Sequence, residues 1–228
     1  MRHQRIYHLS ERAITIEWQH VIDKHIHQHI MALDQDLKKN PFPGWMENVP
    51  SYHTLTIYYD PFSTETDPLH LLEDRLNHFI EDKAVATRKL KVPVCYDPAY
   101  AIDMPLVTKQ LGLSAEEVIR FHLEQTYSVF MIGFMPGFPY MGKLNPKLFI
   151  ERKAIPSKAI PAGSVAIAGF QTGIYPFESP GGWYVIGRTP WKLFENGKST
   201  FEPGDEIEFE QISHQQMKDI INKMNHEH

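Results

Sequence analysis

The chain has 228 residues, 42% of them hydrophobic, with 23 Lys plus Arg against 28 Asp plus Glu, and thus a formal net charge of −5 with histidine neutral. This composition fits one or two folded domains and excludes general disorder, and the mild acidity does not suit a nucleic-acid-binding surface. The single Cys95 excludes an internal disulfide, and no apolar run approaches the ~20 residues that span a bilayer. Residues 1–12 do not resemble a signal peptide, so we expect a cytoplasmic protein that binds neither nucleic acid nor membrane.

The N-terminal part of the chain alternates strand and helix patterns. Apolar residues recur at every second position in 12–18 and 53–59, which predicts two strands. Apolar stripes at helical spacing predict helices over 21–39 and 68–83. Short strands with two amphipathic helices are typical of an α+β sandwich, which we expect over residues 1–88.

The pattern changes after a linker predicted over 83–89. A strand is expected at 90–94, and Ser114 with Glu117 forms a capping box that predicts a helix near 114–126.

The C-terminal half of the chain has the pattern of a β domain. From 131 to 205 only short β runs occur, separated by Pro and Gly, and a last helix is predicted at 217–224. Residues 89–228 therefore predict a second, mainly-β domain with a barrel or sandwich.

Two motifs suggest chemistry that their context does not support. Residues 137–144 (GFPYMGKL) approach the phosphate-binding loop GxxxxGK[ST], but Leu144 stands where a Mg²⁺-binding hydroxyl belongs. Pro139 also removes a backbone N–H of the kind that cradles phosphate. His25 and His29 could bind a metal weakly at their i, i+4 spacing, but no third ligand lies nearby. We therefore expect His25 and His29 to lie on a solvated flank of the helix and to bind no metal ion.

Two single residues have alternative interpretations. Cys95 lies in a predicted strand, and the residues around it do not form the signature of a catalytic cysteine. We therefore expect its side chain to be a small buried apolar group. His122 lies near the apolar edge of the 114–126 helix, where it is either a half-buried histidine bonded to a carbonyl or a proton-transfer group.

The most informative region consists of loops between 133 and 190 that combine Pro, Gly and aromatic residues. Rigid aromatic side chains on rigid loops form pre-shaped pockets at low entropic cost. The alternative is that these aromatics are loop cores packed over the end of a barrel. The aromatic residues interleave with possible anchors for a carboxylate, amide or phosphate, and the set comprises Phe134, Phe138, Tyr140, Tyr175 and Trp183 with Arg152, Gln171 and Arg188.

Four motifs in this region carry a family resemblance: GFMPGFPYMGKL, IPAGSVAIAG, QTGIYP and SPGGWYVIGRTP. In this order and spacing, the chain resembles the allophanate hydrolase subunit 1 family over nearly its whole length. That family includes a kinase A inhibitor of sporulating bacteria and the B subunit of bacterial ATP-dependent 5-oxoprolinase. The resemblance implies an α+β N-terminal domain followed by a mainly-β cyclophilin-like barrel domain.

The resemblance also implies a function and partners. It implies an enzyme subunit, inactive alone, that acts with the A subunit of 5-oxoprolinase and a carboxylase-related subunit 2-type partner to open the small cyclic amide 5-oxoproline to glutamate. ATP, with Mg²⁺, is the cofactor implied for the complex. Alternatives are a binding module that inhibits a sensor histidine kinase and a subunit of an allophanate or urea amidolyase-type hydrolase. A further alternative, peptidyl-prolyl isomerase activity, is suggested by the fold alone, and a fold does not determine function.

Matching positions give the residues that we expect in the site. His122 and Arg188 are expected to be catalytic. Where the family often has Pro-Arg, this chain has Pro156-Ser157, and Lys158 is the cation that could substitute, without the bidentate contact of arginine. The residues expected to contact substrate are Phe138, Tyr140, Arg152, Lys158, Gln171, Tyr175 and Trp183.

Overall fold

The computed structural model describes residues 5–79 and 87–226, the side chains of 225 and 226 excepted. The chain divides into two compact units, residues 1–87 and 88–228, and each is described by itself. Most of the linker predicted over 83–89 lies outside the described residues. Within the described residues, no helix combines the length and apolarity needed to cross a membrane.

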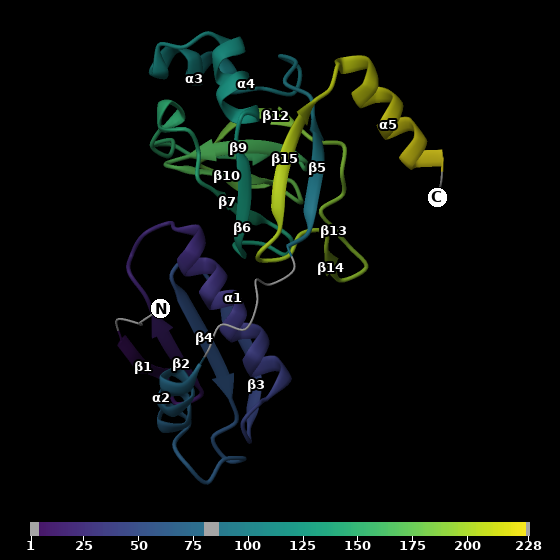
Figure 1. Cartoon of the computed structure of the whole chain (residues 1–228). Helices are drawn as coiled ribbons and strands as arrows, with labels where there is room; N and C mark the ends of the chain where they lie inside the picture. Colours follow the sequence, from purple (N-terminus) through teal and green to yellow (C-terminus); the bar gives the residue numbers. More distant parts are fainter. Residues whose placement is uncertain (1–4, 80–86, 227–228) are drawn as a thin grey trace. The chain divides into compact units, whose positions relative to one another are not determined.

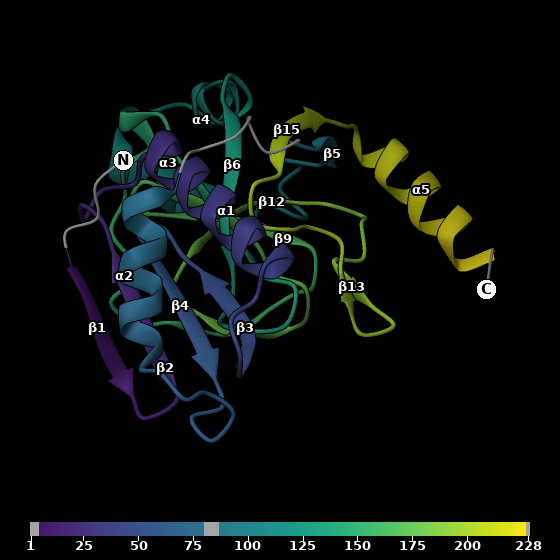
Figure 2. The same cartoon turned by 60° about the horizontal axis from the view of Figure 1, so that its bottom comes forward.

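Unit 1 is an antiparallel sheet of four strands covered by two helices on one face (Figure 2). The strand order is β1-β2-β4-β3, and the two strands predicted from alternation, β2 and β4, lie in its centre. The edge strands β1 and β3 were not predicted. The elements are β1 (Arg5–Ser10), β2 (Ala13–Glu17), α1 (Lys24–Lys39), β3 (Trp45–Pro50), β4 (Thr54–Tyr59) and α2 (Pro68–His78).

Helix α1 shows why this unit folds as it does. The carboxylate of Asp23 accepts the backbone N–H groups of His25 and Ile26 at 2.8 and 3.0 Å and so caps the helix. The predicted apolar stripe is buried against the sheet. The expected solvated histidine flank is wrong for His29, which is 3% exposed and packs edge-on against Trp18 at 5.8 Å. Its ring therefore belongs to the core of unit 1.

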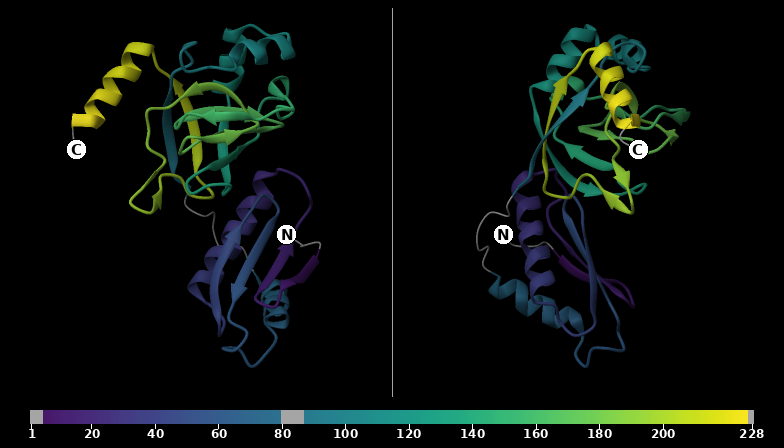
Figure 3. Two further views of the ribbon diagram at one scale, coloured as in Figure 1. Left: turned by 180° about the vertical axis from the view of Figure 1, so that it is seen from behind. Right: turned by 90° about the vertical axis from the view of Figure 1, so that its right-hand side faces the viewer.

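Unit 2 is built on a seven-stranded sheet of order β12-β9-β10-β7-β6-β15-β5, which curls into a barrel (Figures 1 and 3). Only the β15–β5 pair is parallel. The residue after β5, Cys95, exchanges backbone hydrogen bonds with Arg188 of β12 at 2.8 and 2.9 Å, which joins the two outer strands. The strands are β5 (Lys89–Val94), β6 (Thr126–Ile132), β7 (Pro139–Gly142), β9 (Ser164–Ala168), β10 (Gln171–Ile174), β12 (Tyr184–Arg188) and β15 (Glu206–Gln211).

Smaller elements surround this sheet. Helices α3 and α4 pack together at one end of it, and α5 follows β15, buries Met217 and projects from the sheet beyond it (Figure 1). The capping box at Ser114 is confirmed, with both of its hydrogen bonds formed. Helix α3 was not predicted. The elements are α3 (Met104–Leu111), α4 (Ala115–Leu123), a 3₁₀ turn (Pro146–Leu148), β8 (Ser157–Ile160) paired with β11 (Ser179–Gly181), β13 (Phe194–Glu195) paired with β14 (Lys198–Ser199), and α5 (His214–His226).

The sheet is buried on both of its faces where the proposed site lies. Successive residues of a strand point to opposite faces, and in β9 Val165 and Ile167 belong to the main core of unit 2. Ala166 and Ala168 of the same strand belong to a second apolar cluster, together with Phe138 and other aromatics. This second cluster is the setting of the pocket described next. Unit 2 is built around this curled sheet, and the predicted domain bounds and cyclophilin-like character stay predictions.

Candidate functional site

An open pocket of about 280 Å³ lies against the second apolar cluster. Its residues come from the loop after β6, from β7, from the segment before β8, from the residue after β10, and from β11 with the turn that joins it to β12. The pocket therefore gathers the aromatic loops that the sequence singled out. It is lined by Phe134, Phe138, Tyr140, Arg152, Pro156, Tyr175, Pro180, Gly181, Gly182 and Trp183.

Phe138 is the centre of the aromatic lining. Its ring centroid lies 4.8 Å from Tyr140, 5.2 Å from Tyr175 and 5.5 Å from Trp183, and all three pairs are edge-to-face. This is the arrangement that the quadrupoles of aromatic rings favour. Each ring thus holds its neighbours in place, and the pocket has a pre-formed apolar wall.

Two glycines allow the rings to approach the backbone so closely. A Cβ at Gly173 of β10 would lie 2.7 Å from Cζ of Phe138, and a Cβ at Gly181 would overlap the hydroxyl of Tyr175. These glycines are thus required by close packing of the aromatic rings.

The polar groups of the pocket are two phenols and one guanidinium. Burial raises the pKa of Tyr175 to about 12. Burial also raises the pKa of Tyr140, an effect that the positive charge of Arg152 opposes. Both phenols therefore stay protonated near neutral pH and can donate a hydrogen bond. Arg152 is exposed, with its guanidinium carbon 5.9 Å from the ring centroid of Trp183, so the pocket carries a cation at its rim.

The structure brings together Phe138, Tyr140, Arg152, Tyr175 and Trp183, all of which were predicted to contact substrate. Lys158 and Gln171 do not line this pocket. Lys158 is exposed on β8, and Gln171 begins β10, opposite Gly142 and Ala168.

His122 lies away from these residues, in the main core of unit 2. It is fully buried and stacks on Phe209 at 4.6 Å. Its Nδ1 contacts the Tyr96 hydroxyl at 2.8 Å, and its Nε2 contacts the Thr172 hydroxyl at 3.1 Å. Burial lowers the pKa of His122 to about 3. A neutral, enclosed imidazole with both nitrogens in hydrogen bonds suits a core residue, so the proton-transfer role expected for it gains no support.

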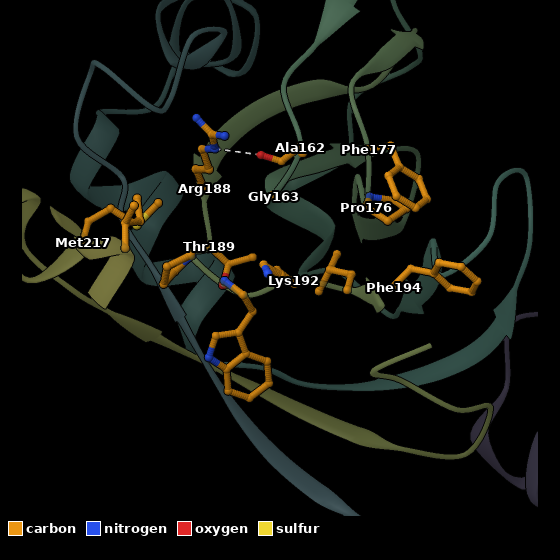
Figure 4. Close-up of a pocket in the computed structure, with 13 residues that line it drawn as sticks. Ala162, Gly163, Pro176, Phe177, Arg188, Thr189, Lys192, Phe194 and Met217 are labelled. Carbon is orange, nitrogen blue, oxygen red and sulfur yellow. Dashed lines mark hydrogen bonds between the residues drawn. The ribbon is translucent and has the colours of Figure 1, made fainter. Parts of the chain in front are cut away.

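Arg188 lines a different cavity, of about 360 Å³, which shares no lining residue with the aromatic pocket (Figure 4). Its Nε donates to the carbonyl of Ala162 at 2.7 Å. The two residues expected to be catalytic are thus both placed outside the aromatic pocket.

A buried ion pair next to the pocket was not predicted. Nζ of Lys153 donates to Oδ2 of Asp103 at 2.6 Å and to Oγ of Ser157 at 2.8 Å, and both charged side chains are about nine-tenths buried. The same carboxylate oxygen accepts the backbone N–H of Val185 at 2.8 Å. Because Lys153 directly follows Arg152, the pair fixes the segment that carries the rim cation. Lys153 follows Glu151 and Arg152 in a charged run, so no local pattern set it apart from an exposed lysine.

The rim of the pocket also carries backbone strain. Phe134 adopts a left-handed conformation, with φ of 66°, and is 63% exposed. For a bulky residue this conformation is rare and is often found at binding sites.

The structure tests the near match to a phosphate-binding loop at residues 137–144. The segment that approached a phosphate-binding loop forms strand β7, which pairs with β6 and β10, and Leu144 is buried. Its backbone groups are committed to a sheet, unlike those of a phosphate cradle. Among the described residues, no group of three His, Cys, Asp or Glu side chains could hold a metal. The fold and the pocket thus define a barrel protein with a small-molecule-sized, aromatic, cation-rimmed pocket.

Comparisons with known proteins agree on the family. Residues 4–203 match the family described as carboxyltransferase domain, subdomain C and D. The chain is 37% identical to the B subunit of 5-oxoprolinase from Bacillus subtilis, over 92% of this chain and 93% of that relative. It is 33% identical to the B subunit of 5-oxoprolinase from Escherichia coli O157:H7, over 92% and 96% of the two chains. The chain belongs to the carboxyltransferase subdomain C and D family, and the resemblance inferred from the four motifs is confirmed.

A solved structure extends this likeness to three dimensions. The protein TTHA0988 superposes with a TM-score of 0.78 at 33% identity, over 88% of this chain. The chain spans 40% of the length of that protein.

Proposed function

We propose that the chain is the B subunit of an ATP-dependent 5-oxoprolinase, a cytoplasmic complex that opens the lactam of 5-oxoproline to glutamate. The observation that carries the proposal is the identity of 33% and 37%, over most of the chain, to two relatives named as the B subunit of 5-oxoprolinase. The A subunit of that enzyme and a subunit 2-type protein are the proposed partners. ATP and Mg²⁺ are the proposed cofactors of the complex.

The aromatic pocket is the proposed contribution of this chain to substrate binding. 5-Oxoproline is a small ring with apolar methylenes, one amide and one carboxylate. The ring would pack on Phe138 and Trp183, and the carboxylate would pair with Arg152 at the rim. The neutral hydroxyls of Tyr140 and Tyr175 are the groups available to donate to the amide oxygen.

Reconstitution of the three-subunit complex tests the proposal. We expect 5-oxoproline-dependent ADP release and glutamate formation only when this chain is present, and Arg152→Met is expected to raise KM by about tenfold or more through the lost charge-assisted contact. Lys158→Met, which removes an exposed cation outside the pocket, is the matched control. Equal turnover without this chain, or no turnover with all three subunits, would overturn the proposal.

A second function, inhibition of a sensor histidine kinase, is favoured by one observation. Two large apolar side chains in the loops around the pocket are strongly exposed, Phe134 at 63% and Ile155 at 85%. Exposed apolar residues at a rim are typical of a protein-binding surface. Inhibition of a purified kinase by the wild type, lost in a Phe134→Ser/Ile155→Ser variant that still supports 5-oxoproline turnover, would support this function beside the first.

A further inference from the structure

The cavity that holds Arg188 has the features of a second ligand site. Three loop regions of unit 2 and helix α5 border it (Figure 4). Its volume of about 360 Å³ falls in the range of small-molecule pockets. Its lining comprises Ala162, Gly163, Pro176, Phe177, Arg188, Thr189, Pro190, Trp191, Lys192, Leu193, Phe194, Met217 and Ile221.

Arg188 is held rigidly at this cavity. Its backbone forms the two hydrogen bonds with Cys95 that join the outer strands of the barrel. Its side chain is fixed by the bond from Nε to the carbonyl of Ala162, 2.7 Å long. Gly163 lets the backbone of Thr189 come close beside it, because a Cβ there would lie 2.5 Å from the carbonyl oxygen of Thr189. The guanidinium is therefore oriented before any ligand arrives.

The outer end of the guanidinium remains available. Across residues 5–79 and 87–226, its two terminal nitrogens have no ion-pair or hydrogen-bond partner. In Figure 4 they lie at the edge of the cavity, on the side away from Thr189. The other cation of the lining, Lys192, already pairs with Glu195 at 2.9 Å. Arg188 thus supplies the uncompensated positive charge of the cavity.

Apart from Thr189 and Lys192, the remaining side chains of the lining are apolar. Phe177 and Phe194 pair edge-to-face at 5.9 Å on one side, and α5 contributes Met217 and Ile221 on another. Two parallel N–H groups of a guanidinium match the two oxygens of a planar carboxylate. We infer that this cavity binds a small carboxylate with an apolar or aromatic body, at a site separate from the aromatic pocket.

The two tryptophans of unit 2 make the test specific, because Trp191 lines this cavity and Trp183 lines the aromatic pocket. The ¹⁵N-labelled full chain would be titrated with 3-phenylpropionate, with its neutral amide and with phenyl phosphate, while the indole N–H signals are followed. We expect 3-phenylpropionate to shift the Trp191 signal in a saturable way, and the neutral amide to bind at least about tenfold more weakly.

Substitutions of Arg188 test whether its positive charge binds the carboxylate. Arg188→Met is expected to weaken 3-phenylpropionate binding by about tenfold or more, and Arg188→Lys by less, since it keeps the charge but loses the bidentate contact. Arg152→Met, at the aromatic pocket, is the matched control and should leave the Trp191 titration unchanged. In each variant, unchanged signals from residues away from the substitution verify that the chain is folded.

Three results would overturn the inference: no Trp191 shift up to about 10 mM carboxylate, equal binding of acid and amide, or equal affinity in Arg188→Met and wild type. If phenyl phosphate bound more tightly than 3-phenylpropionate, the ligand would be a phosphate ester instead of a carboxylate, and the inference would be wrong in this respect. None of these results depends on 5-oxoproline turnover, so the inference and the proposed function can fail separately.

Discussion

Replacing Lys153 by methionine isolates the electrostatic role of the buried pair beside the aromatic pocket. Methionine keeps an apolar chain near the ring of Tyr184, which lies 5.4 Å from Nζ, and removes only the charge and its hydrogen bonds. The carboxylate of Asp103, 10% exposed, would then be a buried charge without its counter-ion. Breaking such a pair from one side costs about 3–5 kcal/mol.

The expected loss can be measured with urea. With an m-value of about 2 kcal/mol per molar, a loss of 3–5 kcal/mol lowers the unfolding midpoint of unit 2 by about 1.5–2.5 M. The native indole signal of Trp183 reports on that unit in the full chain. Lys192→Met is the control, because its pair with Glu195 is about half exposed and is worth at most about 1 kcal/mol.

A double variant tests the cause of the loss. Lys153→Met/Asp103→Asn removes the uncompensated charge and keeps an oxygen to accept the N–H of Val185. We expect it to be more stable than Lys153→Met alone. The reasoning is refuted if Lys153→Met loses no more than Lys192→Met, or if the double variant is the less stable of the two.

Three further predictions concern the packing and titration of unit 2. Gly173→Ala forces a Cβ to within 2.7 Å of Phe138, so we expect a loss of about 1–3 kcal/mol in urea unfolding, recovered in part by Phe138→Leu. Because the folded pKa of Tyr175 is about 12, stability should fall as pH rises from about 10, its ordinary value, to about 12. Tyr175→Phe should remove that part of the ultraviolet phenolate titration, and loss of a step near 10 instead would contradict it. Because the folded pKa of His122 is depressed to about 3, the unfolded chain takes up this proton first, and stability should fall as pH drops from about 6.5 towards 3. An imidazole NMR signal of His122 that titrates near 6.5 in the folded chain would contradict this assignment.

Local patterns predicted the central elements of the fold. Strands β2 and β4 lie in the predicted segments 12–18 and 53–59, and α4 begins at the predicted capping box. The edge strands β1 and β3 were missed because their exposed residues break the alternation. Helix α3 has only eight residues, and its signals were a proline in the first turn and Gly112 in the left-handed conformation at its end. Short elements of this kind depend on packing more than on their own sequence.

The site was predictable to the extent that its residues share a few loops. Phe138, Tyr140 and Trp183 are in contact although β7 and β12, the strands at which they lie, are not neighbours in the sheet. The Lys153–Asp103 pair joins residues 50 positions apart, and nothing local marks it. Arg188 was grouped with the aromatic residues, whereas it lines another cavity, where its Nε donates to the carbonyl of Ala162, a contact that the sequence does not reveal. Long-range contacts thus decide which charges face which pocket.

The way the barrel closes has a consequence for how the chain folds during synthesis. Strand β5 opens unit 2 but pairs along its length only with β15, near the other end of the chain. Arg88 and Asp205, which form an ion pair beside these strands, are 117 positions apart. Contacts of such separation form late, because a long loop must first be closed. Unit 1, whose sheet partners all lie within its own 87 residues, can fold on the ribosome before β15, the partner of β5, has been synthesised.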